Sequence, residues 1–148
     1  MAAAEKYKTE LIRTANSLVA DGKGLLAADE SIGSIEKRFK AVNVENNEER
    51  RRNWREVLFT SSGEIGKYLG GIITFEETLM KHSTSKGTPL VEEIQNRGLV
   101  PGIKTDKGTV KIPGTEDETS TQGLDGLAER SQEYYKQGAR FAKWFVFI

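Results

Sequence analysis

The stretch LLAADESIGSIEKR (residues 25–38) joins a short apolar run to two carboxylates and then to a turn and a helix. Its first four residues have the length and apolarity of a buried parallel strand. Asp29 and Glu30 follow at the carboxyl end of that strand, where α/β folds keep their catalytic side chains. Ser31 and Ser34 suit the N-terminus of the next helix. The stretch therefore predicts a strand–loop–helix unit with charged groups at the strand end.

Two later stretches repeat the pattern of an apolar run that ends in a charged residue. They are GIKTDKG (102–108), which carries Lys104, and GARFAKW (138–144), which carries Lys143. A lysine within a buried strand is costly unless it is paired or functional. The alternative is a lysine at the last strand position that reaches into water. Because side chains alternate along a strand, Lys143 shares one face with Phe145.

Helices and strands alternate along the whole chain, which favours right-handed βαβ units and a parallel sheet. A complete barrel takes eight strands and about 250 residues. The 148 residues hold four predicted strands. We therefore predict an α/β fold of the TIM (β/α)8 barrel class, limited to its first half of about four βα units. The predicted strands cover residues 25–28, 72–75, 99–104 and 141 onward, the helices 7–20, 35–42, 46–58, 89–98 and 124–137, and one hairpin arm 110–112.

The predicted helix over residues 46–58 carries both apolar residues and a cluster of arginines. Asn46 begins it in the manner of a capping box, with a glutamate three residues later. We expect Trp54, Val57 and Leu58 to form its apolar face. We expect Arg50 and Arg52 to lie on a solvated basic face.

Composition excludes several classes of function. Lys plus Arg and Asp plus Glu number 22 each, so no basic field favours nucleic acid or an anionic membrane. Without cysteine there is no disulfide framework and no thiolate metal site. The apolar runs are too short for a membrane span, and the N-terminus lacks the layout of a signal peptide. We therefore expect a soluble cytoplasmic protein without nucleic-acid or membrane partners.

His82 is the only histidine, within the polar stretch KHSTSKGT. A single histidine argues against Ser–His–Asp chemistry and against two-histidine metal sites. We expect the His82 side chain to be exposed to solvent.

Two residues of the first stretch have the spacing of an anion site. Ser34 and Arg38 are four residues apart, hence on one helical face, and Gly33 gives access to the backbone. That arrangement suits an anion at a helix N-terminus, although the same spacing is common without one. For Asp29, the residues alone leave open a helix-capping role beside that of a proton acceptor or a ligand of a substrate hydroxyl.

Together with GLDGLAERSQEYYKQGARFAKW (123–144), these stretches resemble the class I fructose-bisphosphate aldolases, from about Tyr7 to Trp144. The resemblance implies a glycolytic lyase that reversibly cleaves fructose 1,6-bisphosphate into dihydroxyacetone phosphate and glyceraldehyde 3-phosphate. The chemistry implied is a lysine Schiff base, with no metal or other cofactor. The implied substrate partner is a phosphorylated sugar, and the full-length family members are expected to be homotetramers.

The resemblance also implies roles for seven residues. Asp29 and Lys143 are the implied catalytic residues, near the carbons that react. Ser34 and Arg38 help to hold a phosphate, and Glu30 orients neighbouring polar groups. Asp106 and Lys107, just beyond Lys104, are expected at the rim of the site. The implied substrate-binding residues are Glu30, Ser34, Arg38, Arg51 and Lys104.

The chain departs from the family pattern after Trp144. The family has an arginine two residues beyond its active-site lysine, where this chain has Phe145, and residues 145–148 form an apolar tail. The Schiff-base lysine of the family lies beyond Ile148. We therefore expect residues 1–148 to form an incomplete barrel domain, which is either a fragment or the product of a truncated gene model. We expect this chain to be inactive alone and to associate with itself.

Two alternatives remain open. The first is a non-catalytic half-barrel that binds sugar phosphates or pairs with another chain through an open strand edge. The second is a different Schiff-base enzyme that uses Lys143 itself.

Overall fold

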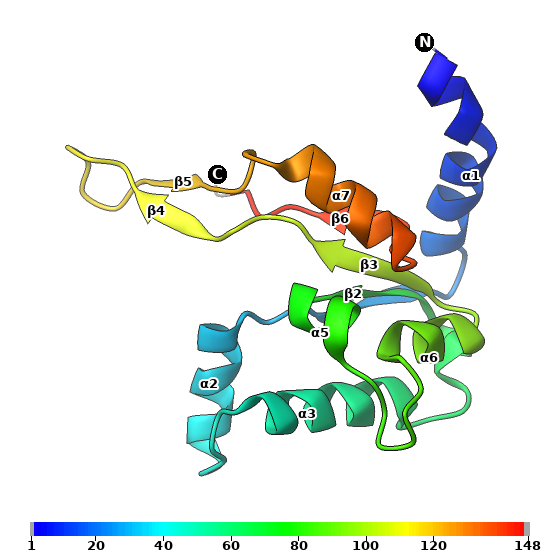
Figure 1. The fold of residues 1–148 in the computed structure, drawn as a ribbon, viewed down its shortest axis with the longest axis horizontal. Helices are drawn as coiled ribbons and strands as arrows, with labels where there is room; N and C mark the ends of the chain where they lie inside the picture. The colour runs from blue at the N-terminus through cyan, green and yellow to red at the C-terminus, as the bar shows by residue number, and fades with distance from the viewer. Residues whose placement is uncertain (1, 147–148) are drawn as a thin grey trace.

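A computed structural model describes residues 2–146 of the chain. Its centre is a parallel four-stranded sheet in the order β1–β2–β3–β6, with each strand beside its predecessor in the sheet (Figure 1). This arrangement confirms the predicted α/β class and is consistent with part of a (β/α)8 barrel. The strands are β1 (Gly24–Ala28), β2 (Leu69–Thr74), β3 (Val100–Lys104) and β6 (Phe141–Lys143).

Helices connect the strands and cover the sheet, and a small hairpin projects from the body (Figure 1). The hairpin pairs β4 (Thr109–Lys111) with β5 (Thr119–Thr121) in antiparallel fashion, which confirms the expected arm at 110–112. The short helices α4 and α5 are additions to the predicted set. The helices are α1 (Ala2–Leu18), α2 (Ile32–Ala41), α3 (Glu48–Thr60), α4 (Ile65–Tyr68), α5 (Glu76–Lys81), α6 (Leu90–Asn96) and α7 (Leu127–Lys136).

Two apolar clusters bury one face of the sheet beneath the helices. Alternation along the strands sends every second side chain to this face, where helices α3, α5, α6 and α7 remove it from water. The first cluster contains Ala28, Phe59, Ile72, Leu90, Ile94 and Leu99. The second contains Leu79, Ile103, Tyr134 and Ala139.

The opposite face of the sheet holds an aromatic ring over two glycines. A Cβ atom on Gly102 would lie 2.2 Å from the ring of Phe141, and one on Gly71 would lie 3.1 Å from the same ring. Only a residue without a side chain leaves that space. The glycines therefore let Phe141 lie flat against the sheet, on the face that a complete barrel would enclose.

The start of α3 and its arginines differ in part from expectation. Asn47, not Asn46, is the N-cap, because its side-chain Oδ1 accepts a hydrogen bond of 3.0 Å from the backbone N–H of Arg50. Arg50 is exposed as expected. Arg52 is not on a solvated face, since its guanidinium donates to Glu56 Oε2 at 2.7 Å and to the carbonyl of residue 83 at 3.0 Å.

The buried face of α3 also differs in part from the predicted one. Val57 is 58% exposed, whereas Phe59 and Arg55 are buried. The predicted apolar face is confirmed for Leu58, which packs against the first apolar cluster, and Trp54 is half-buried, whereas the prediction is wrong for Val57. The apolar pattern did not indicate Arg55, which has a carboxylate partner on a distant segment, described below.

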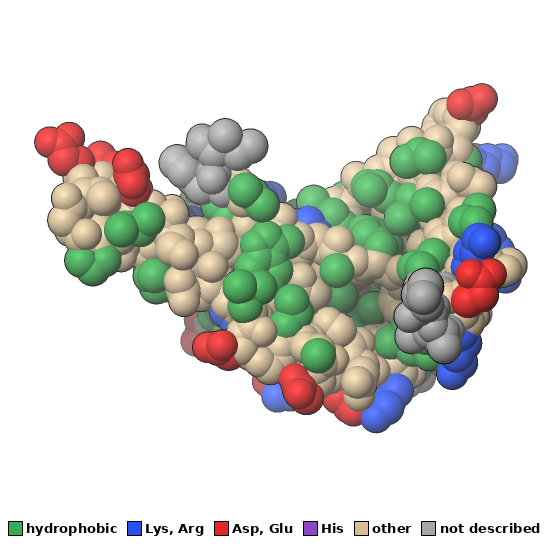
Figure 2. All heavy atoms as spheres, turned by 90° about the horizontal axis from the view of Figure 1, so that it is seen from above, with side chains coloured by type: hydrophobic (Ala, Val, Ile, Leu, Met, Phe, Trp, Pro, Cys, Tyr) green, Lys and Arg blue, Asp and Glu red, His purple; other side chains and the backbone are tan. Residues whose placement is uncertain are grey.

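Apolar side chains gather across the middle of the face shown in Figure 2, between the projecting hairpin and α1. Several large apolar residues of α1 and of the C-terminal segment are exposed, among them Leu11, Ile12, Phe145 and Val146. The last two residues of the 145–148 tail lie outside the described part of the chain. Within residues 2–146, no helix combines the length and the apolarity needed to cross a membrane.

Candidate functional site

An ion pair joins the two edge strands of the sheet at their carboxyl ends. Lys143 Nζ lies 2.7 Å from Asp29 Oδ2, with the Asp29 side chain 11% exposed and that of Lys143 32% exposed. The contact has the distance of an ion pair without the alignment of a hydrogen bond. Strands β1 and β6 are the first and last of the sheet, so the two side chains reach each other across the ends of the strands between them. The two predicted catalytic residues thus lie together.

A cavity of about 270 Å³ surrounds this ion pair. Six of the seven residues predicted for the site line it, and they come from segments separated by more than a hundred positions in the sequence. Carboxyl ends of parallel strands meet at one edge of a sheet, which explains the convergence. The lining residues are Ala27, Asp29, Glu30, Ser31, Ser34, Arg38, Lys104 and Lys143.

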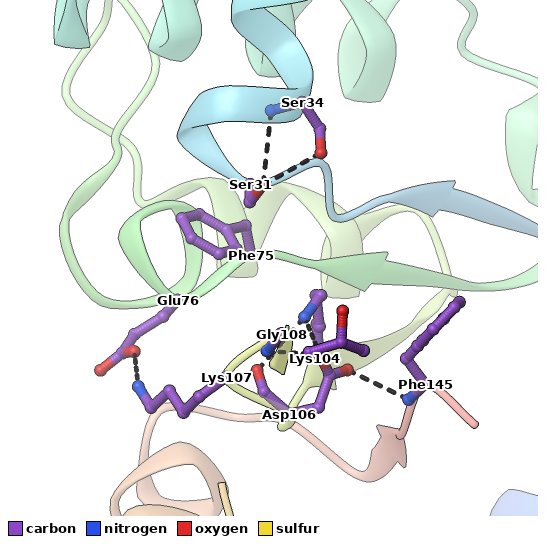
Figure 3. Close-up of a pocket in the computed structure, with 10 residues that line it drawn as sticks. Ser31, Ser34, Phe75, Glu76, Lys104, Asp106, Lys107, Gly108 and Phe145 are labelled. Atoms are coloured by element: carbon purple, nitrogen blue, oxygen red, sulfur yellow. Dashed lines mark hydrogen bonds and ion pairs between the residues drawn. The ribbon is translucent and has the colours of Figure 1, made fainter. Parts of the chain in front are cut away.

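The N-terminus of α2 contributes two hydroxyl groups to the cavity (Figure 3). Ser31 is the N-cap, and its Oγ accepts from the backbone N–H of Ser34 at 3.4 Å. The two hydroxyl oxygens lie 3.0 Å apart. With Arg38 one turn further on, this helix end presents hydroxyls, unpaired backbone N–H groups and a cation, which together suit an anion.

A buried arginine anchors the carboxylate that holds Arg38. Arg55 is 2% exposed, contacts Glu30 Oε2 through Nη1, and donates from Nη2 to the carbonyl of Glu30 at 3.0 Å. Glu30 Oε1 lies 3.2 Å from Arg38 Nη1. Burial acts to raise the pKa of Glu30, but the hydrogen bond and charge of Arg55, with the charge of Arg38, hold that pKa below its ordinary value. Glu30 is therefore an anion that orients cations.

A second cavity, of about 400 Å³, shares Ser31, Ser34 and Lys104 with the first (Figure 3). The Lys104 ammonium contacts Asp106 Oδ1 and donates to the Asp106 carbonyl at 3.2 Å. Burial acts to raise the pKa of Asp106, but Lys104 and the backbone N–H groups of Gly108 and Phe145 hold it below its ordinary value. Phe145 lines this cavity, at the position where the resemblance led us to expect an arginine.

Ser31, Phe75 and Glu76 line these cavities without having been singled out as site residues in the sequence. Glu76 Oε2 pairs with Lys107 Nζ at 2.8 Å, so the second cavity has a charged rim. Asp106 and Lys107 belong to the lining, at the expected rim position. Phe75 and Glu76 directly follow strand β2. The expectation that functional side chains follow the carboxyl ends of parallel strands, which identified the other site residues, would have identified these two as well.

Arg51 is absent from the described residues that line the two cavities. Its Nε and Nη2 donate to the two carboxylate oxygens of Glu77 at 2.8 and 2.7 Å, and its Nη1 donates to Asn46 Oδ1 at 2.9 Å. The Arg51 side chain is 11% exposed. Its predicted contact with substrate stays a prediction, and in this structure the guanidinium tethers α3 to α5.

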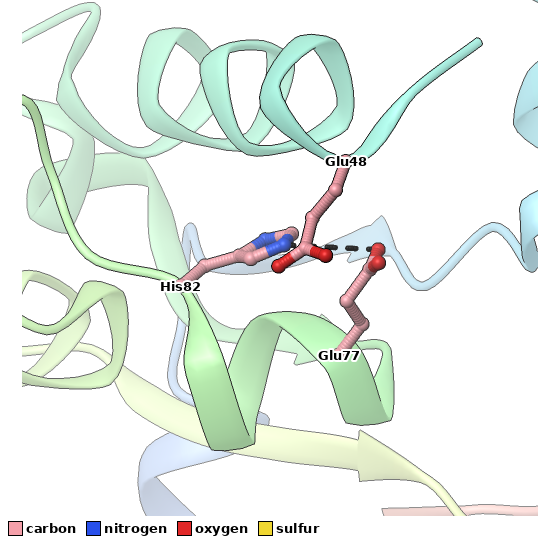
Figure 4. Close-up of side chains that lie close together, drawn as sticks. All are labelled: Glu48, Glu77 and His82. Carbon is pink, nitrogen blue, oxygen red and sulfur yellow. Dashed lines mark ion pairs between the residues drawn. The ribbon is translucent and has the colours of Figure 1, made fainter.

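His82 is buried, so the expectation of an exposed side chain was wrong. The polar residues around it suggested a surface loop, but the chain folds back there. The His82 backbone N–H donates to the Thr78 carbonyl, and the His82 carbonyl accepts from Leu90 at 2.9 Å. The residue is 4% exposed, and its imidazole lies between α3 and α5 (Figure 4). Burial lowers the pKa of His82 below its ordinary value despite the opposing charge of Glu77.

Comparison with known proteins gives one consistent family. The chain matches the family model "Fructose-bisphosphate aldolase class-I" over residues 10–148. It is 57% identical over 135 residues to fructose-bisphosphate aldolase 2 of Plasmodium berghei (strain Anka), covering 91% of this chain and 36% of that protein. It is 57% identical over 139 residues to the cytosolic fructose-bisphosphate aldolase 5 of Arabidopsis thaliana, covering 94% of this chain and 38% of that protein.

A solved structure agrees with these matches. The fructose-bisphosphate aldolase of Plasmodium falciparum, in complex with TRAP and a small-molecule inhibitor, superposes with a TM-score of 0.89 at 53% identity. The match covers 94% of this chain and 40% of that one. The chain thus spans less than two fifths of the length of these two curated relatives.

Proposed function

Because the chain belongs to the class I fructose-bisphosphate aldolase family, we propose that its strand ends supply one wall of a site that cleaves fructose 1,6-bisphosphate. One observation carries the proposal: the 2.7 Å contact between Asp29 and Lys143 inside a cavity of about 270 Å³. The two side chains, a carboxylate and an ammonium, lie side by side and both residues line the cavity. The relatives reported above are named fructose-bisphosphate aldolases, which supports this choice of substrate.

Asp29 and Lys143 act on the reacting carbons in this proposal. Class I cleavage passes through an iminium formed by a lysine amine, which accepts the electron pair when the carbon–carbon bond breaks. The substrate hydroxyl beside that bond must lose its proton. Asp29, held by Lys143 at 2.7 Å, holds this hydroxyl or accepts its proton, and the Lys143 ammonium stabilises the carboxylate and a substrate oxygen.

Ser34, Arg38 and Lys104 bind a phosphate of the substrate in this proposal. They line the same cavity, at a helix N-terminus and a strand end. Glu30 keeps Arg38 oriented through the 3.2 Å contact, and Arg55 in turn fixes Glu30. Phosphate binding replaces part of the Glu30–Arg38 contact by charged hydrogen bonds to the ligand.

The chain of 148 residues alone does not turn over substrate in this proposal. Each lysine that lines the 270 Å³ cavity is paired with a carboxylate, Lys143 with Asp29 and Lys104 with Asp106. An ammonium in an ion pair has no lone pair for attack on a carbonyl, so both lysines serve as auxiliary cations. The relatives named cytosolic and cytoplasmic support a cytoplasmic location for the whole protein.

Calorimetric titration with fructose 1,6-bisphosphate tests whether the chain binds the substrate phosphate as proposed. Arg38→Ala should weaken binding by about 1.5–3 kcal/mol, or roughly 10- to 150-fold in Kd, which is the range for a hydrogen bond to a charged group. Lys40→Ala is the matched control, because Lys40 lies on the same helix and pairs with Glu36 away from the cavity. An Arg38→Ala protein with unchanged affinity would remove the phosphate assignment.

A non-catalytic half-barrel is the second candidate, supported by the exposed apolar side chains of the C-terminal segment. Borohydride reduction with a ketose phosphate, followed by peptide mapping, separates the candidates. We expect no stable adduct on the chain alone. An adduct on Lys143 would favour a Schiff-base enzyme that uses this lysine, and absence of both adduct and binding would favour an interaction module.

A further inference from the structure

Three side chains that can bind metal converge between α3 and α5, apart from the cavities described above (Figure 4). Glu48 comes from the first turn of α3, Glu77 from α5, and His82 from the residue that ends α5. One ligand atom of each lies within 4.8 Å of the other two. His82 Nε2 and Glu77 Oε2 are 3.7 Å apart. Figure 4 shows the three side chains pointing toward one another.

The imidazole of His82 is the independent sign that something binds here. Its side chain is 2% exposed, and neither ring nitrogen has a hydrogen-bond partner among residues 2–146. Buried polar atoms are nearly always paired, and each unpaired one calls for an explanation. In the neutral tautomer that carries its proton on Nδ1, the Nε2 atom next to Glu77 has a free lone pair and can act as a metal ligand.

We propose that Glu48, Glu77 and His82 bind one divalent transition-metal ion of the Zn²⁺ class. Zinc lies about 2.0–2.2 Å from histidine nitrogen and carboxylate oxygen, which puts neighbouring ligand atoms of a tetrahedron about 3.4 Å apart. The 3.7 Å between His82 and Glu77 is close to that spacing. Glu48 is exposed, so rotation of its side chain completes the set. Imidazole with carboxylates selects zinc-like ions over Mg²⁺ or Ca²⁺.

The charges around the cluster are compatible with a divalent ion. Glu48 and Glu77 supply two negative charges, the neutral imidazole adds none, and Arg51 adds one positive charge, so the site with a divalent ion carries one net positive charge. Arg51 already donates one hydrogen bond to each oxygen of Glu77, but each oxygen has a second lone pair. Arg51 therefore becomes the outer partner that orients a ligating carboxylate, a common arrangement around protein-bound metals. Arg55, the other cation near the imidazole, is neutralised by Glu30.

The bound ion would fix α3 to α5, and with them the ends of strands β1 and β2. This role is structural, so it is independent of the sugar-phosphate proposal and needs no metal in the cleavage reaction. A structural site of this kind stabilises the folded chain by mass action, because the unfolded chain does not hold its three ligands together.

Titration of the tag-free chain with ZnCl2 tests the proposal, because the chain has a single histidine and no cysteine. We expect one Zn²⁺ per chain and a large change in the ¹⁵N shift of one His82 ring nitrogen. Glu48→Gln should weaken binding at least about tenfold, in line with the sensitivity of metal sites to their ligands and outer partners. Glu49→Gln, an exposed neighbour outside the cluster, should bind as the wild type does.

His82→Gln should abolish stoichiometric binding, and Glu48→Gln, at an exposed position, provides the test if the histidine variant fails to fold. The proposal is overturned if the wild-type chain binds no Zn²⁺. It is equally overturned if the His82 ring signals do not move, or if Glu48→Gln and Glu49→Gln bind Zn²⁺ with the same affinity.

Discussion

Replacing Glu30 by Gln should destabilise the fold by about 3 kcal/mol, because it leaves the buried guanidinium of Arg55 without a counter-charge. Arg55 is 2% exposed and the Glu30 side chain 11% exposed. Removing one partner of a buried ion pair typically costs about 3–5 kcal/mol. We take the lower end, since a glutamine oxygen still accepts a hydrogen bond and the backbone carbonyl of residue 30 keeps its 3.0 Å contact with Arg55.

Urea unfolding followed by tryptophan fluorescence measures this effect, with Trp54 next to Arg55 as the local probe. At an m value of about 1–3 kcal/mol/M, a loss of 3 kcal/mol lowers the midpoint by roughly 1–3 M. Glu36→Gln is the control, because it removes a carboxylate from an exposed pair with Lys40 and should leave the midpoint in place. Both variants need the same protein concentration, since association affects the midpoint.

The pH dependence of the Glu30→Gln effect has a defined sign. The pKa of Glu30 is lowered in the folded protein relative to its ordinary value of 4.5. The contribution of the carboxylate is therefore complete above that value and is lost as pH falls through the lowered folded pKa. The gap between wild type and variant should be full at neutral pH and shrink in acid. Equal midpoints for Glu30→Gln and Glu36→Gln at neutral pH would refute the reasoning.

Three further predictions concern the sheet and the C-terminal segment. Gly102→Ala should lower the free energy of unfolding by about 1–3 kcal/mol, because its Cβ would lie 2.2 Å from the Phe141 ring. Gly63→Ala is the control, since its Cβ would meet nothing within 4 Å, and the urea midpoints of the two variants are compared. Deleting residues 145–148 should reduce self-association in analytical ultracentrifugation, since 42% of Phe145 is exposed, and an unchanged distribution would contradict this. Phe145→Arg in the 148-residue chain should not produce measurable sugar-bisphosphate cleavage, and a cleavage rate above that of wild type would contradict the view that the chain is inactive alone.

Local sequence pattern predicted the sheet well, because a buried parallel strand is recognisable from a few neighbouring residues. The strand expected at residues 25–28 is β1, Gly24–Ala28, and the run expected at 99–104 is β3, Val100–Lys104. The same rule located most of the cavity lining. Once strands are parallel and adjacent, the residues that follow them must converge, as Asp29 and Lys143 do.

Burial of charged and polar side chains could not be predicted in the same way. The partner that makes burial of Arg55 tolerable is Glu30, 25 positions earlier in the chain. The burial of His82 likewise depends on packing between α3 and α5, which no local pattern records. Val57 was expected inside on helical periodicity, but the buried stripe of α3 follows Arg55 and Phe59. Long-range pairing and packing determined the burial of Arg55 and His82, which apolar periodicity does not predict.

A chimera tests the central claim most directly. Residues 1–144 of this chain replace the matching segment of a full-length relative, such as the Plasmodium berghei aldolase, and release of triose phosphate from fructose 1,6-bisphosphate is measured. We predict cleavage by the chimera, a loss of about 10²-fold or more with Asp29→Asn, the scale for a lost acid–base group, and full activity with Asp21→Asn at an exposed turn. A folded chimera without activity, or an Asp29→Asn chimera as active as its parent, would contradict the placement of the site at these strand ends.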